Sequence, residues 1–96
     1  MEDILFVKRI IMENKHLFEF ELTEKDVDDT LTEYLVEQTI AKAIDYCTSE
    51  NFSGDEFKYH KEGFIIGYIG EHINIRKKAL EENDEDFLNI LDNIYK

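Results

Sequence analysis

Hydrophobic and polar residues alternate most regularly in residues 17–22 (LFEFEL), near the N-terminus. After Leu17, three apolar side chains are separated by single glutamates, so that one side is apolar and the other acidic. A period of two residues is typical of a strand that buries one face. We therefore expect a half-buried β-strand in this segment.

The preceding run, residues 4–12 (ILFVKRIIM), is apolar almost throughout, and neither a helical period nor a strand period fits it well. Residues 13–16 separate this run from the alternating segment. They could form the turn of a hairpin, or Asn14 could terminate a helix. Both alternatives stay open, with the hairpin preferred.

A helix is expected within residues 24–48. Thr23 precedes Asp26 by three residues and Thr30 precedes Glu33 by three, which is the spacing of a capping box. The apolar residues of this segment form two stripes on opposite faces: Val27, Leu31 and Leu35, and then Val36, Ile40, Ala43, Ile44 and Cys47. A surface helix needs only one stripe. Two stripes indicate a central helix, a break near its middle, or burial against a second chain.

The second half of the chain contains a clear loop at 49–54 and an apolar run at 64–69 (FIIGYI) that is typical of a buried strand. Residues 61–63 are interpreted as the turn before this strand. Residues 71–82 are ambiguous and become helical by 77–82. A final amphipathic helix is expected over residues 84–95, with Asn83 as its N-cap.

Taken together, these elements predict an α+β fold in one small domain, residues 1–96. The predicted domain has an antiparallel sheet of about three to four strands. The sheet packs against a long central helix (24–48) and a C-terminal helix (84–95).

The charge of the chain is strongly acidic. Asp and Glu number 23 against 11 Lys and Arg, which gives a net charge of −12. Such a surface repels nucleic acids and anionic membranes and attracts basic proteins. The single cysteine and the acidic N-terminus favour a cytoplasmic protein. The preference for Lys over Arg and the lack of Pro suggest AT-rich codons, as in a low-GC bacterium or its phage.

Part of this charge falls on one helical stripe, which is our candidate partner-binding face. Asp26, Asp29, Glu33 and Glu37 are spaced three, four and four residues apart, and Ile40 continues the stripe. Like charges at that spacing cost a helix about 0.2–0.5 kcal/mol per pair. The steps of about 5–6 Å are close to the spacing of backbone phosphates, so the face could imitate a nucleic acid. The alternative is a solvated face without a function.

The residues that carry chemistry form no recognisable catalytic or metal motif. His16, His60 and His72 lack the spacing of a helical zinc site, and Cys47 continues an apolar stripe, as expected of a core cysteine. We therefore expect no enzymatic activity, no cofactor and no metal. A minor alternative is a small enzyme that uses Glu71 with His72 or His60.

Two short segments carry a resemblance to a known family. Ser53-Gly54-Asp55 and residues 59–63 (YHKEG) resemble a stretch of the immunity proteins that neutralise nuclease colicins. The chain lacks that family's paired tyrosines before proline, and a strand at 64–69 would not fit its all-helical fold. The resemblance is confined to residues 53–63, and no family is assigned from it.

The functional expectation is an acidic binding or inhibitor protein. Its partner would be a basic protein, for example at a surface that faces nucleic acid, as for immunity proteins, antitoxins, phage anti-host or anti-defence proteins and DNA mimics. Direct binding to nucleic acid or to membranes is not expected. The alternative is a structural or regulatory homo-oligomer, such as a homodimer, with no inhibitory role.

Overall fold

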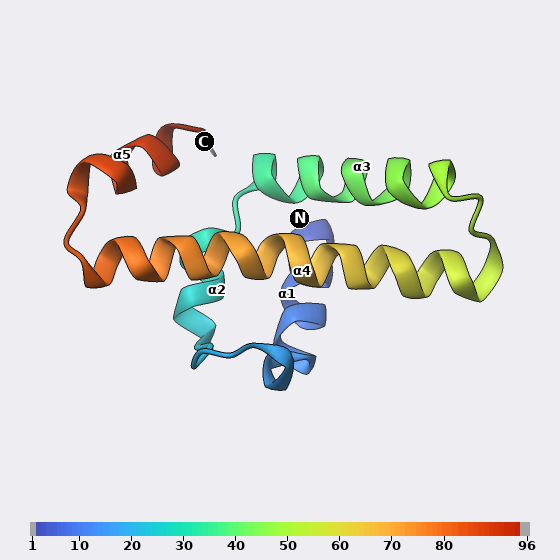
Figure 1. Cartoon of the computed structure of the whole chain (residues 1–96), viewed down its shortest axis with the longest axis horizontal. Helices are drawn as coiled ribbons and strands as arrows, with labels where there is room; N and C mark the ends of the chain where they lie inside the picture. The colour runs from blue at the N-terminus through green and yellow to red at the C-terminus, as the bar shows by residue number, and fades with distance from the viewer. Residues whose placement is uncertain (1, 95–96) are drawn as a thin grey trace.

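A computed structural model describes residues 2–94, and its regular structure is entirely helical (Figure 1). The elements are α1 (Glu2–Glu13), the 3-10 helix η1 (Lys15–Leu17), α2 (Glu24–Thr30), α3 (Glu33–Ser49), α4 (Gly54–Glu81) and α5 (Glu85–Ile94). The predicted α+β fold with an antiparallel sheet is therefore wrong, since residues 2–94 contain no strand.

The long helix α4 is the element on which the others pack. Its 28 residues give a length of about 42 Å. Helix α3 runs back along α4 as the other arm of a hairpin, and α5 folds back over the opposite end of α4 (Figure 1). Helices α1 and α2 cross α4, and both contact it. Every other α-helix therefore contacts α4.

The core explains why the two apolar runs are helices. In α4 the fully buried side chains are Ile65, Ile69 and Ile73, which repeat every four residues. In α1, Val7 and Ile11 are fully buried at the same spacing. A short apolar run does not distinguish a buried strand from a buried helix. The predicted strand at 64–69 and the predicted turn at 61–63 are wrong, because both segments lie inside α4.

The predicted central helix over 24–48 is two helices. Helix α2 ends at Thr30, and Leu31 adopts an extended backbone while its side chain stays buried. Thr32 then caps α3, with its hydroxyl accepting a hydrogen bond from the Leu35 N–H (3.1 Å). The break, one of the three explanations for the two apolar stripes, is the one that the structure contains.

The alternating segment has the predicted burial but not the predicted partner. Phe18 and Phe20 are half-buried, and Glu19 and Glu21 are exposed. The segment packs against α4 rather than beside another strand, and the Phe18 ring lies against Gly70. Any extended segment that lies on an apolar surface buries every second side chain. The alternation therefore indicates which side chains are buried, and it does not show that the segment pairs with another strand.

The ends of several elements agree with the sequence. The predicted loop at 49–54 coincides with the α3–α4 connection, and the C-terminal helix was expected at 84–95 and spans Glu85–Ile94. Residue 95 lies outside the described residues. Asp84, not Asn83, caps this helix by accepting from the Phe87 N–H (3.0 Å). The alternative in which Asn14 terminates a helix is confirmed, since α1 ends at Glu13.

Among residues 2–94, no helix combines the length and the apolar character that crossing a membrane requires.

Candidate functional site

Helix α2 begins with a capping box that fixes the position of Asp26. The Thr23 hydroxyl accepts a hydrogen bond from the Asp26 N–H (3.2 Å), and the Asp26 carboxylate accepts one from the Thr23 N–H (3.0 Å). This is the arrangement that the Thr–x–x–Asp spacing predicts. Asp26, the first residue of the predicted binding stripe, therefore has a structural role at the start of α2.

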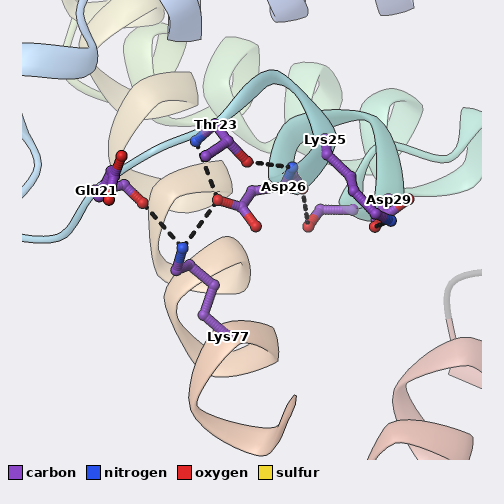
Figure 2. A network of polar contacts seen from close by, with 7 residues as sticks. Glu21, Thr23, Lys25, Asp26, Asp29 and Lys77 are labelled. Carbon is purple, nitrogen blue, oxygen red and sulfur yellow. Dashed lines mark hydrogen bonds and ion pairs between the residues drawn. The ribbon is translucent and has the colours of Figure 1, made fainter. Parts of the chain in front are cut away.

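Lys77 of α4 adds an ion pair to this cap (Figure 2). Its ammonium group donates to the Asp26 carboxylate (2.9 Å) and to the Glu21 carbonyl oxygen (2.9 Å). It also lies 5.8 Å from the centre of the Phe20 ring, within cation–π range. Burial alone would raise the pKa of Asp26, but the hydrogen bonds from Lys77 and Thr23 outweigh it and lower the pKa below its usual value.

The other carboxylates of α2 are also paired with lysines. Lys8 of α1 lies 2.8 Å from Glu24 and 2.9 Å from Asp28, and Lys25 lies 2.6 Å from Asp29. Hydrogen bonds to these carboxylates raise the pKa values of Lys8 and Lys25. All four acids of α2 thus face a lysine of the same chain, and much of the negative field of α2 is cancelled internally.

Glu33 and Glu37 lie in a different environment, at the start of α3. Together with the first turn of α1 they surround a hollow of about 460 Å³, which we call the acidic hollow. The residues that line it are Glu2, Asp3, Ile4, Glu33, Val36 and Glu37. Its four carboxylate side chains are exposed, and within residues 2–94 none of them forms an ion pair.

The electrostatics of the acidic hollow follow from two helix ends. Glu2 and Asp3 occupy the first turn of α1, and Glu33 the first turn of α3. The partial positive charge of a helix N-terminus favours acids there by about 0.3–1 kcal/mol. Four exposed carboxylates beside the half-buried Ile4 suit a long basic side chain, because its stem can pack on Ile4 while its charge meets the carboxylates.

The predicted binding stripe is therefore divided by the break between α2 and α3. Asp26 and Asp29 lie on α2 and are paired internally, whereas Glu33 and Glu37 line the acidic hollow. Ile40 is half-buried and packs against the core. The structure brings Glu33 and Glu37 together with Glu2 and Asp3, which the sequence-based stripe did not include.

Glu2 and Asp3 are visible in the sequence as acids at the start of the chain, but their spacing does not connect them with Glu33 and Glu37. Both lie far along the chain from the predicted binding stripe. Nothing in the local sequence indicates that the first turn of α1 packs beside α3, about thirty residues further on. Their role in the hollow depends on tertiary contacts.

The histidines and the cysteine do not gather into one site. His60 and His72 are twelve residues apart on α4, a separation of about 18 Å. Burial lowers the pKa of His72, and the neighbouring Glu71 partly offsets this effect. Cys47 is fully buried, which confirms its interpretation as a core residue. Within residues 2–94, no group of three or more His, Cys, Asp or Glu side chains is placed to hold a metal ion.

Comparisons with known proteins give no family for the chain. No family model, no curated protein and no solved structure matches it. The helical conformation of residues 64–69 removes one of the two objections to the resemblance with immunity proteins. The chain still lacks the paired tyrosines of that family, and no family model matches it.

Proposed function

We propose that this protein binds a basic surface of another protein through the acidic hollow and thereby blocks or adapts that surface. The observation that carries the proposal is the contrast in pairing. The acids of α2 meet lysines of the same chain, whereas the four carboxylates of the acidic hollow meet none within residues 2–94.

The mechanism would be electrostatic steering followed by insertion of a basic side chain. A net charge of −12 draws a basic partner toward the chain and raises the association rate at low salt. A Lys or Arg side chain then enters the acidic hollow, where the half-buried Ile4 contacts its stem and the carboxylates pair with its charge. A partner that binds nucleic acid through the same basic residues would lose that activity.

Proteins with this mode of action include immunity proteins, antitoxins, phage anti-host and anti-defence proteins and nucleic-acid mimics. We place the protein in this functional class and in the cytoplasm, since its acidic surface suits intracellular basic partners. We favour this class over a homo-oligomer, because the break between α2 and α3 explains most of the two apolar stripes without a second chain.

The test compares two variants of equal charge. One replaces the acids of the acidic hollow (Glu2→Gln, Asp3→Asn, Glu33→Gln, Glu37→Gln). The control replaces four exposed acids outside it (Asp45→Asn, Glu50→Gln, Asp55→Asn, Glu56→Gln), two of which also occupy a first helical turn, that of α4. Each protein is immobilised, and the captured proteins are identified by mass spectrometry.

We expect a basic protein that binds the wild type and the control variant and is lost from the hollow variant. Its affinity, measured by calorimetry at several salt concentrations, should fall as salt rises. Equal capture by both variants would reject the acidic hollow as the site, and an equal loss relative to the wild type would show that only total charge matters.

A further inference from the structure

A second concave surface lies at the other end of α1. It is a groove of about 450 Å³ whose walls come from α3, α4 and the η1 segment, and we call it the aromatic groove. The side chains that matter for its chemistry are Leu17, Tyr46, Tyr59, His60, Glu62 and Phe64. Tyr59 is 76% exposed and Leu17 is 61% exposed, so the groove presents apolar surface to solvent.

The rings of the groove support one another. Tyr46 of α3 stacks on Phe64 of α4, with ring centres 5.6 Å apart and planes 27° apart. His60 lies flat on Phe52 at 4.0 Å, and Tyr59 meets the His60 ring edge-on at 5.4 Å. Rings held by such contacts lose little conformational entropy when a ligand binds, which favours recognition.

The chemistry of the lining selects the occupant. The faces of the exposed Tyr59 ring carry the negative part of the aromatic quadrupole, the partly exposed Tyr46 ring lies beside it in the lining, and Glu62 adds a carboxylate. Among the described lining residues there is no lysine or arginine. A cation that is also flat and apolar on its faces fits best, since it can stack on the rings and pair with the carboxylate. Arginine has this chemistry, and lysine has only part of it.

We propose that the aromatic groove binds an arginine side chain of the basic partner. The proposal rests on the proposed function, because the same partner would contact both surfaces. The acidic hollow includes the first turn of α1 and the groove includes Asn14, just after its last residue, so about 18 Å of helix separates them. Charge complementarity, from Glu62 and from the net charge of −12, favours this occupant over an acidic or neutral one.

The direct test uses a defined probe and the intact chain. Isotope-labelled protein is titrated with the peptide acetyl-Gly-Arg-Gly-amide, and amide shifts are followed by NMR. The same peptide with citrulline, which has the shape of arginine without its charge, and the peptides with lysine or leucine are compared. We expect shifts centred on Tyr59, Glu62 and Gly63, with the citrulline peptide about tenfold weaker.

Two results would overturn the proposal. Equal shifts from the citrulline or leucine peptide would show a groove that takes any apolar group. Shifts confined to the acidic hollow would show that arginine binds there alone.

Variants separate this proposal from the proposed function. Tyr59→Ala and Glu62→Gln should each weaken binding of the arginine peptide by about tenfold, because each removes one of the two favourable contacts. Tyr34→Ala is the control, since Tyr34 is an exposed tyrosine of α3 outside the groove. If the groove variants keep full affinity for the peptide while the hollow variant loses the protein partner, this inference fails and the proposed function stands. If the groove variants lose the peptide while the hollow variant keeps the partner, the proposed function fails and the groove stands.

Discussion

Two acidic regions of this chain have similar compositions and different surroundings. Helix α2 carries Glu24, Asp26, Asp28 and Asp29, and each of these carboxylates contacts a lysine of the same chain. The acidic hollow also has four carboxylates, and no lysine or arginine is among its described lining residues. Whether a carboxylate stabilises the fold or is available to a partner therefore depends on which cations the fold brings to it.

The cations of α2 come from three separate places. Lys8 is supplied by α1, Lys25 by α2 itself and Lys77 by α4, which is 51 residues away from Asp26 in sequence. The contact between Lys77 and Asp26 is the least exposed of these pairs. It should therefore contribute most to stability, because solvent screens the exposed pairs.

The largest effect is expected from Lys77→Met, which keeps the apolar stem and removes the ammonium group. The substitution leaves the Asp26 carboxylate without its cation and the Glu21 carbonyl oxygen without its donor. We expect the free energy of unfolding to fall by about 2 kcal/mol in urea denaturation.

Two controls test this prediction, one at the residue next to Lys77 and one in the acidic hollow. Lys78→Met removes an exposed charge one residue away and should change stability by less than about 0.5 kcal/mol. The double variant Glu33→Gln, Glu37→Gln should lower stability by less than about 1 kcal/mol, because the loss of the helix-dipole interaction of Glu33 is partly offset by relief of repulsion between the two carboxylates. If instead it destabilises the protein as much as Lys77→Met does, the acidic hollow is structural and the comparison fails.

A smaller effect is expected where the segment before α2 packs on α4. A methyl group at Gly70 would overlap the Phe18 ring, whereas one at Gly67 would meet nothing within 4 Å. Overpacking costs about 1–3 kcal/mol, and replacing a helical glycine by alanine gains up to about 1 kcal/mol. Gly70→Ala should thus lower stability by about 1 kcal/mol, and Gly67→Ala should raise it by about 0.5–1 kcal/mol.

Thermal unfolding followed by circular dichroism would measure both glycine variants. The prediction requires that Gly70→Ala lowers the melting temperature and that Gly67→Ala raises it. Stabilisation by both substitutions would mean that Phe18 does not hold the connecting segment against α4.

The smallest effect is the pH dependence of the Lys77 contribution. The pKa of Asp26 is lowered in the folded state, so its contribution is complete above the usual value of about 4 and is lost as pH falls through the lowered pKa. The stability difference between wild type and Lys77→Met should be constant near neutral pH and should narrow below about pH 4. Urea denaturation of both proteins at a series of pH values measures it. A difference that stays constant at low pH would contradict the role of the Asp26 carboxylate.

Local signals in the sequence predicted local structure well. The spacing of Thr23 and Asp26 predicted the capping box, and the alternation after Leu17 predicted which side chains are buried. The fold class was wrong because residues 64–69 are short, rich in β-branched residues and interrupted by Gly67. Isoleucine favours a strand and glycine disfavours a helix, yet the wider repeat through Ile73 places the run in a helix, where tertiary packing overrides propensity.

Only two of the four acids of the acidic hollow could be predicted from the sequence, because the positions of the others depend on tertiary packing. Glu33 and Glu37 follow from charge and spacing alone. The pairing of Asp26 with Lys77 and the approach of Glu2 and Asp3 to α3 depend on contacts between distant segments. Charge periodicity along a helix does not contain that information.

The central position of α4 sets an order of events during synthesis. Helices α1 and α2 leave the ribosome before α4, yet α1 buries Val7 and Ile11 in a core that α4 completes with Ile65 and Ile69. Until α4 emerges, α1 can contact α2 and α3, but the apolar faces of α1 and α2 lack the surface that α4 supplies. A nascent chain in that state is exposed to aggregation. The net negative charge of the first thirty residues, to which Asp26 contributes fully before Lys77 arrives, would then keep neighbouring nascent chains apart.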